Sequence, residues 1–149
     1  MTFKQKVHSH FLNVINERIS LLQKALADLS ESVANETKST AGDKHETALA
    51  MLQIEQANTG TQLKDAKNKK AALERINPLI VASTIVNGSL IITDRGYLFL
   101  STSLGKAIID DISVTALSAQ SPLGLKLLSL SVDQIAEINN TKYVIESIE

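Results

Sequence analysis

The stretch Ala41-Gly42-Asp43-Lys44-His45-Glu46 decides the fold, because it separates two long helical patterns of nearly equal length. One pattern reaches it from the N-terminus, and the other leads away from it to about Ile76. Two matched helices joined by a short turn are expected to form an antiparallel hairpin. Asp43 and Glu46 would then stand together at the tip of a long rod, which can enter a site that a globular surface could not reach.

The first helical pattern has the periodicity of a coiled-coil seam. Its apolar residues recur at alternating steps of three and four, at Leu12, Ile15, Ile19, Leu22, Leu26, Leu29 and Val33. Neither glycine nor proline occurs before Gly42. The pattern therefore predicts a helix from near Phe3 to near Lys38, about 50 Å long at 1.5 Å per residue.

The second helical pattern, from about Asp43 to Ile76, is less regular. Its heptad positions fall at Leu49, Leu52, Gln56, Thr59, Leu63, Ala66, Lys70 and Leu73, three of which are polar. Gly60 lies inside the pattern, at a cost of about 1 kcal/mol relative to alanine. Asn77-Pro78 ends the pattern, because proline disfavours a helical residue before it. The matched lengths favour a hairpin closed within one chain and a monomer. A dimeric coiled coil is the alternative that the sequence leaves open.

After the hairpin, predicted for residues 1–77, the pattern changes to that of an α+β domain. Residues 78–84 form a mostly apolar connector, and residues 85–149 predict a small antiparallel β-sheet domain with one short helix. Ser121-Pro122 favours a helix start, and Asn139-Asn140 favours a hairpin turn. The expected strands and helix are Ile85–Ile92 with a bulge, Tyr97–Leu100, Ile112–Leu117, the helix Leu123–Leu128, a strand around Val132, Ile135 and Ile138, and Tyr143–Ile145.

Composition excludes several classes of function. The chain of 149 residues has no cysteine, so thiolate metal sites and cysteine nucleophiles are absent. No apolar run approaches the roughly 20 residues of a membrane span, and the N-terminus lacks a signal-peptide core. A cytoplasmic protein without membrane contact is expected. Residues 1–77 carry 11 basic against 9 acidic residues, and 78–149 carry 4 against 7, so neither half predicts strong DNA binding.

Asp43 and Glu46 have two compatible interpretations. Aspartate at the N-cap with glutamate at the third helical position is similar to a capping box. The electropositive N-terminus of a helix also favours carboxylates. Two carboxylates alone hold Mg²⁺ weakly. They could complete a metal site whose other ligands belong to a partner, and there position an attacking water.

A basic run at Lys64, Lys67, Lys69 and Lys70 lies on the second helical pattern. It is either a solvated helix face or a weak phosphate-contacting stripe, with Lys64 and Lys67 as the candidate nucleic-acid contacts. No aromatic residue interleaves with these lysines, so base stacking is not supported.

The chain resembles the bacterial Gre transcript-cleavage factors, as a divergent branch. Their coiled-coil hairpin carries a Gly-Asp-x-x-Glu tip and precedes a small FKBP-like domain, and here the tip reads Gly42-Asp43-Lys44-His45-Glu46. Ser121-Pro122-Leu123-Gly124 is similar to the segment that opens the short helix of the Gre C-terminal domain. Lys142–Ile148 resembles that domain's last strand. Each motif alone is weak, but their order and spacing are fairly specific.

The resemblance implies an accessory factor and not an enzyme acting alone. The C-terminal domain would dock on RNA polymerase at the rim of its secondary channel, through Gln120, Ser121, Pro122 and Leu123. The hairpin would enter the channel, in indirect contact with the RNA. There Asp43 and Glu46 would help hold the second Mg²⁺ of the polymerase active site, so that a backtracked transcript is cut.

The tip departs from the family pattern. The family continues it with Asn-Ala-Glu-Tyr, whereas Thr47-Ala48-Leu49-Ala50 follows here, and Lys44 adds positive charge. The residue before Ser-Pro is commonly acidic in the family but is Gln120 here. A channel-binding regulator or inhibitor without cleavage activity is therefore one alternative, and a structural adaptor that dimerises through the heptad seam is another.

Overall fold

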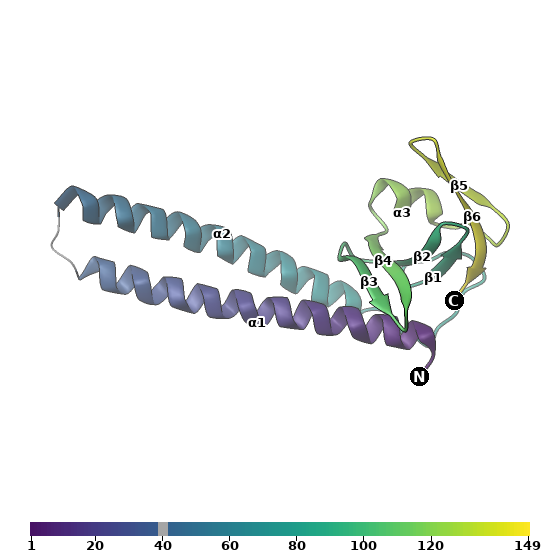
Figure 1. The fold of residues 1–149 in the computed structure, drawn as a ribbon, viewed down its shortest axis with the longest axis horizontal. Coiled ribbons are helices and arrows are strands. Elements are labelled where there is room, and N and C mark those ends of the chain that lie inside the picture. The colour runs from purple at the N-terminus through teal and green to yellow at the C-terminus, as the bar shows by residue number, and fades with distance from the viewer. Residues whose placement is uncertain (39–41) are drawn as a thin grey trace. The chain divides into compact units, whose positions relative to one another are not determined.

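The structure is a computed structural model that describes residues 1–38 and 42–149, and the side chains of all of these except residues 42–45. The predicted turn residue Ala41 lies outside the described residues. Helix α1 covers Phe3–Thr37 and helix α2 covers Gly42–Glu74, as Figure 1 shows. Both bounds lie within two residues of the sequence prediction. The unbroken runs without proline explain their length.

Helices α1 and α2 pair in antiparallel fashion. Nε2 of His8 lies 2.7 Å from the carbonyl oxygen of Leu73. The Gln56 side-chain amide donates to Oγ of Ser30 at 3.0 Å. As the residue number rises along α1 from 8 to 30, that of its partner on α2 falls from 73 to 56. The seam is therefore closed within a single chain, as the matched helix lengths predict.

The predicted seam residues are the ones that the helix pair shields from water. Ile15 and Ile19 on α1 are buried, as are Leu63, Ala66 and Leu73 on α2. The remaining apolar seam positions are half-buried, because two helices alone cannot cover a side chain on all sides. The polar seam residue Gln56 is also half-buried, and its bond to Ser30 gives one N–H of the amide a partner.

Gly60, inside α2, is a site where a simple change should stabilise the hairpin. A Cβ built there would meet nothing within 4 Å. We expect Gly60→Ala to raise the free energy of unfolding by about 1 kcal/mol, because alanine loses less backbone entropy on entering a helix. Urea unfolding followed by circular dichroism measures the change. An unchanged or lower midpoint would contradict it.

The residues after the hairpin form a mostly antiparallel six-stranded sheet in the order β3-β4-β2-β1-β6-β5, with one short helix, α3. This confirms the predicted fold class. One neighbouring pair, β2 with β4, is parallel. The bounds are β1 Leu90–Thr93, β2 Gly96–Ser101, β3 Gly105–Ile109, β4 Ile112–Ser118, α3 Pro122–Leu127, β5 Ile135–Ile138 and β6 Thr141–Ile148.

Two of the strand predictions need correction. Ile85 and Val86 were expected to begin a bulged strand, but the strand begins at Leu90. Ile85 instead exchanges backbone hydrogen bonds with the segment after α3, because its N–H donates to Leu130 and its C=O accepts from Ser129. Val132 was expected in the fifth strand, which begins only at Ile135.

Strand β3 was not predicted at all. This strand lies at one end of the strand order and is largely exposed. Its side chains therefore do not alternate clearly between buried and exposed positions. The two residues that connect it to β4, Asp110 and Asp111, have φ values of 50° and 63°. Two left-handed residues of this kind make the type of two-residue turn that hairpins prefer. An Asp-Asp pair between isoleucines is the signal that could have indicated the strand.

The core of the sheet domain lies between the sheet and α3. Ile85, Ile91, Leu98, Leu100, Leu127, Ala136 and Ile145 form one buried cluster. Along β2, Leu98 and Leu100 belong to this cluster, whereas Phe99 points to the opposite face of the strand. There its ring stacks on Phe11 of α1 with 6.2 Å between ring centroids. Both faces of β2 are therefore buried.

The chain divides into two compact units. One consists of Met1–Asn13 together with Ala71–Glu149, and the other of Val14–Lys70. The ends of the two long helices thus belong to the same unit as the sheet. Within that unit Phe3 also meets Tyr97 of β2 edge to face, at 5.7 Å between ring centroids. The buried Phe11 and the half-buried Phe3 give the sheet domain more apolar core than residues 85–149 supply alone.

Lys4 of α1 is a buried cation in the first unit. Only 4% of the residue is exposed, and its Nζ donates to the carbonyl oxygen of Ile80 at 2.7 Å. Burial lowers the pKa of Lys4 below its ordinary value of 10.5, and the nearby Glu149 carboxylate only partly opposes that effect. The bond fixes the connector to the start of α1.

Lys4 should make stability depend on pH in the alkaline range. Between the lowered pKa and 10.5, the unfolded chain binds more protons than the folded chain, so the free energy of unfolding rises with pH there. We expect Lys4→Met to remove this rise, measured as the difference between urea unfolding at pH 7 and at pH 10. The same change at the exposed Lys126 should keep it, and identical pH profiles for wild type and Lys4→Met would refute the assignment.

Candidate functional sites

The first candidate site is the start of α2. Because α2 begins at Gly42, Asp43 and Glu46 both fall within its first two turns, three residues apart, and therefore on one face of the helix. Glu46 is exposed to solvent. Since α2 begins at Gly42, Asp43 is already a helical residue and does not hold the N-cap position that the sequence predicted. Its side chain lies outside the described residues, so its metal-binding role remains a prediction.

The helix N-terminus makes this a favourable place for carboxylates, because the unpaired backbone N–H groups carry partial positive charge. Among the side chains that the structure describes, no group of three or more histidine, cysteine, aspartate or glutamate residues could hold a metal ion. Asp43 and Glu46 would supply two oxygen ligands of the kind Mg²⁺ prefers. A tightly held ion would need further ligands from a partner.

The second candidate site begins at the N-terminus of α3, where the predicted cap is confirmed. Ser121 has the extended backbone of an N-cap residue, with φ −67° and ψ 158°, and Pro122 occupies the first turn. Oγ of Ser121 accepts from the N–H of Gly124 at 3.0 Å and donates to the carbonyl oxygen of Ser118 at 2.6 Å. The serine thus ties the start of the helix to the end of β4.

Gly124 in the same segment is a glycine for a steric reason. A Cβ at this position would collide with the carbonyl oxygen of Ser118 and crowd Oγ of Ser121. The helix can approach the end of β4 this closely only without a side chain at Gly124. The serine, proline and glycine of the motif therefore act together to set the position of α3.

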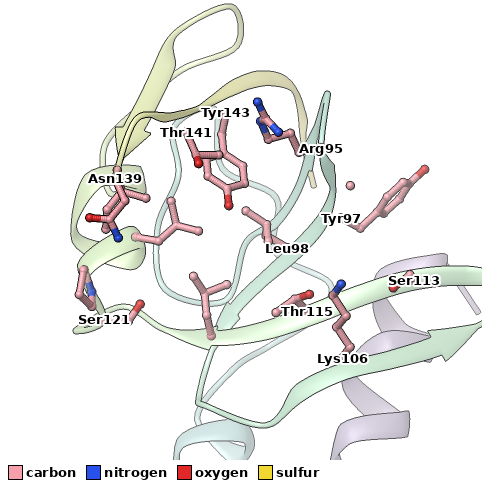
Figure 2. A pocket seen from close by; sticks show the side chains of 15 residues that line it. Arg95, Tyr97, Leu98, Lys106, Ser113, Thr115, Ser121, Asn139, Thr141 and Tyr143 are labelled. Atoms are coloured by element: carbon pink, nitrogen blue, oxygen red, sulfur yellow. The ribbon is translucent and has the colours of Figure 1, made fainter.

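A pocket of about 700 Å³ opens beside this cap. Ser121, Pro122 and Leu123 line it, and the remaining walls come from the β1–β2 turn, β2, β3, β4 and the β5–β6 hairpin (Figure 2). The structure therefore brings three of the four predicted polymerase-binding residues to one cavity. The fourth, Gln120, is exposed and is not among the residues that line it.

The floor of the pocket is apolar and its edge is polar. Leu98 and Leu117 rise from neighbouring strands of the sheet, and both belong to the core or pack against it. Tyr143 directs its hydroxyl group toward the cavity in Figure 2. Ser113, Thr115 and Thr141 add further hydroxyl groups to the walls. Such a surface can hold an apolar group while hydrogen bonds orient it.

Two cations of the pocket, Arg95 and Lys106, were not predicted from the sequence. Lys106 lies on β3 opposite Thr115 of β4, which in turn pairs with Leu98 of β2. This row of residues crosses β3, β4 and β2. The sequence did not predict β3, and β4 and β2 pair in parallel. No local signal could have placed Lys106 beside Leu98.

The basic run on α2 is only partly available as a stripe. Lys64 and Lys67 are exposed. Lys69 pairs with Asp65 at 3.3 Å, one turn earlier on the helix, and Lys70 is half-buried. Lys64 and Lys67 therefore remain the candidate nucleic-acid contacts. Across the described residues, no helix is long and apolar enough to cross a membrane.

Together these features define a two-part protein. A long antiparallel helical hairpin carries two acidic residues at the start of its second helix, and a small mixed sheet carries a polar-edged pocket beside a capped short helix. No protein-family model and no curated protein matches the chain.

The solved structures that are similar to this chain include two transcription-factor chains. One is described as the transcription factor Gfh1, with 13% identity, 92% of each chain covered and a TM-score of 0.37. The other is GreA factor homolog 1 (Gfh1) of Thermus thermophilus, with 18% identity, 97% of this chain and 93% of that chain covered, and a TM-score of 0.33. At these values the similarity assigns neither a family nor a function.

Proposed function

We propose that this protein is a Gre-like transcription elongation factor that binds RNA polymerase in its secondary channel and stimulates cleavage of backtracked transcripts. The observation that carries the proposal is the position of Gly42-Asp43-Lys44-His45-Glu46, which opens the second helix of a closed antiparallel hairpin. The resemblance to Gre factors depends on that motif in that place. Such a factor would share the bacterial cytoplasm with the polymerase.

The proposed roles follow from the two carboxylates that the chain supplies and from the other metal ligands that the polymerase would have to supply. Asp43 and Glu46 would add carboxylate oxygens to a Mg²⁺ ion that the polymerase holds with its own ligands, which lets the ion activate a water for attack on a phosphodiester. The sheet domain would dock through the pocket beside Ser121, Pro122 and Leu123. The nuclease would be the polymerase, and this protein its accessory factor.

A second candidate function is regulation of the polymerase through the same channel without cleavage. The observation that favours it is the sequence after the tip motif, where Leu49 and Ala50 take the places of an acid and an aromatic residue. Leu49 is half-buried at a seam position of α2, so it contributes to helix packing and not to an acidic tip.

A cleavage assay distinguishes these functions. A backtracked elongation complex of the cognate RNA polymerase is incubated with the protein in Mg²⁺, and shortening of the labelled transcript is followed together with binding to the polymerase. Faster cleavage supports the elongation factor. Binding without faster cleavage supports the regulator, and a protein that does not bind the polymerase performs neither function.

A further inference from the structure

We infer that the pocket beside α3 recognises an acidic, partly apolar segment of a protein partner. The inference deepens the proposed function, because it gives the chemistry of the surface on which the sheet domain would dock. It starts from the charges of the pocket. None of the described residues that line it is acidic, although residues 78–149 hold seven acidic residues against four basic ones.

Two of those four basic residues, Arg95 and Lys106, line the pocket. The cavity is thus the cationic part of a domain that is otherwise acidic. A negatively charged ligand is attracted to such a site, whereas the surrounding negative charge disfavours an extended polyanion such as a nucleic acid. The neighbouring Asp94 is not among the residues that line the pocket, and its Oδ1 accepts from the backbone N–H of Val144 at 2.8 Å.

Arg95 is held in position before any ligand binds. Its Nε donates to the carbonyl oxygen of Lys142 at 2.7 Å, and its guanidinium lies 6.0 Å from the centre of the Tyr143 ring. Within the described part of the chain, neither of its terminal nitrogens donates a hydrogen bond. A planar guanidinium fixed in this way can bind a carboxylate through two parallel hydrogen bonds and loses little side-chain entropy.

The apolar floor argues for a peptide over a free anion. Leu98 and Leu117 offer apolar surface that a small carboxylate or a phosphate would leave uncovered. A segment that alternates acidic and apolar side chains would cover that floor and also reach the cations at the edge. The pocket volume of about 700 Å³ lies within the range of roughly 300–1,000 Å³ that is usual for ligand sites.

Neutralising the cations tests the inference on the proposed partner. Binding of cognate RNA polymerase is measured for wild type, Arg95→Gln and Lys106→Gln, with Lys126→Gln, at an exposed lysine outside the pocket lining, as the control. We expect the dissociation constant to rise about ten-fold for Arg95→Gln and about three-fold for Lys106→Gln, and to stay unchanged for the control. The side chain of Lys106 makes no hydrogen bond or ion pair within the described residues, so Lys106→Gln should not disturb the fold.

A peptide pair tests the same chemistry without the polymerase. Two capped eight-residue peptides, one repeating Leu-Glu-Leu-Asp and the other Leu-Gln-Leu-Asn, are titrated into ¹⁵N-labelled wild type. We expect only the acidic peptide to shift the amide signals of Gly96, Thr115 and their neighbours, and Arg95→Gln to weaken this binding about ten-fold. Equal binding of both peptides, or binding of single-stranded RNA at this site, would overturn the inference.

The two measurements separate failure of the inference from failure of the proposed function. If wild type binds the polymerase and Arg95→Gln and Lys106→Gln bind equally well, the inference is wrong and the proposed function stands. If wild type does not bind the polymerase, the proposed function is wrong and the peptide pair decides the inference.

Discussion

Asp43→Asn and Glu46→Gln should each lower stimulated transcript cleavage by about 100-fold while polymerase binding stays intact. Each change removes one negative charge from the tip and keeps the size and shape of the side chain. Loss of one electrostatic group at a reacting centre typically costs a factor of roughly 100 to 1,000 in rate. The rate of transcript shortening in a backtracked complex measures the effect.

The substitutions also separate metal binding from helix stabilisation. Asp43→Asn removes only the charge of a residue in the first turn of α2, which is worth about 0.3–1 kcal/mol there, so the thermal midpoint should fall only slightly. Glu55→Gln, at an exposed acidic residue farther along α2, is the matched control and should cleave like wild type. If the tip variants cleave as fast as wild type, the two carboxylates serve the helix alone.

Gly124→Ala should have the largest effect on stability and should also weaken docking. The added methyl group would collide with the backbone of Ser118, which cannot move without displacing the end of β4. Overpacking of this kind costs about 1–3 kcal/mol and sometimes more. Because α3 also forms one wall of the pocket, polymerase binding should fall with it. Urea unfolding and a binding assay on the same sample measure both effects.

Gly60→Ala is the natural control, because the same chemical change is expected to have the opposite sign there. Gly60 has no neighbour within 4 Å of the new methyl group, whereas Gly124 has backbone in its way. If Gly124→Ala unfolds at the wild-type urea concentration and still binds the polymerase, the motif glycine does not position α3. A stabilised Gly60→Ala variant alongside would show that the measurement resolves changes of this size.

The cap and the tip show which parts of the candidate sites could be predicted from sequence. Ser121 as N-cap with Pro122 after it is a local arrangement, and the structure has it as expected. The position of Asp43 and Glu46 at the start of a helix could also be predicted from neighbouring residues. The metal-binding role proposed for Asp43 and Glu46 does not follow from local sequence in this way, because the other ligands would belong to a different molecule.

The sequence by itself determined the two long helices, the capped short helix and the Asn139-Asn140 turn, whose residues have φ values of 50° and 63°. Each of these depends on residues within a few positions of one another. Only the tertiary structure decided that β2 pairs in parallel with β4, that β3 forms an edge, and that Arg95 and Lys106 line one pocket with Ser121. Those arrangements depend on backbone pairing between distant segments, which the amino-acid pattern of any single segment does not encode.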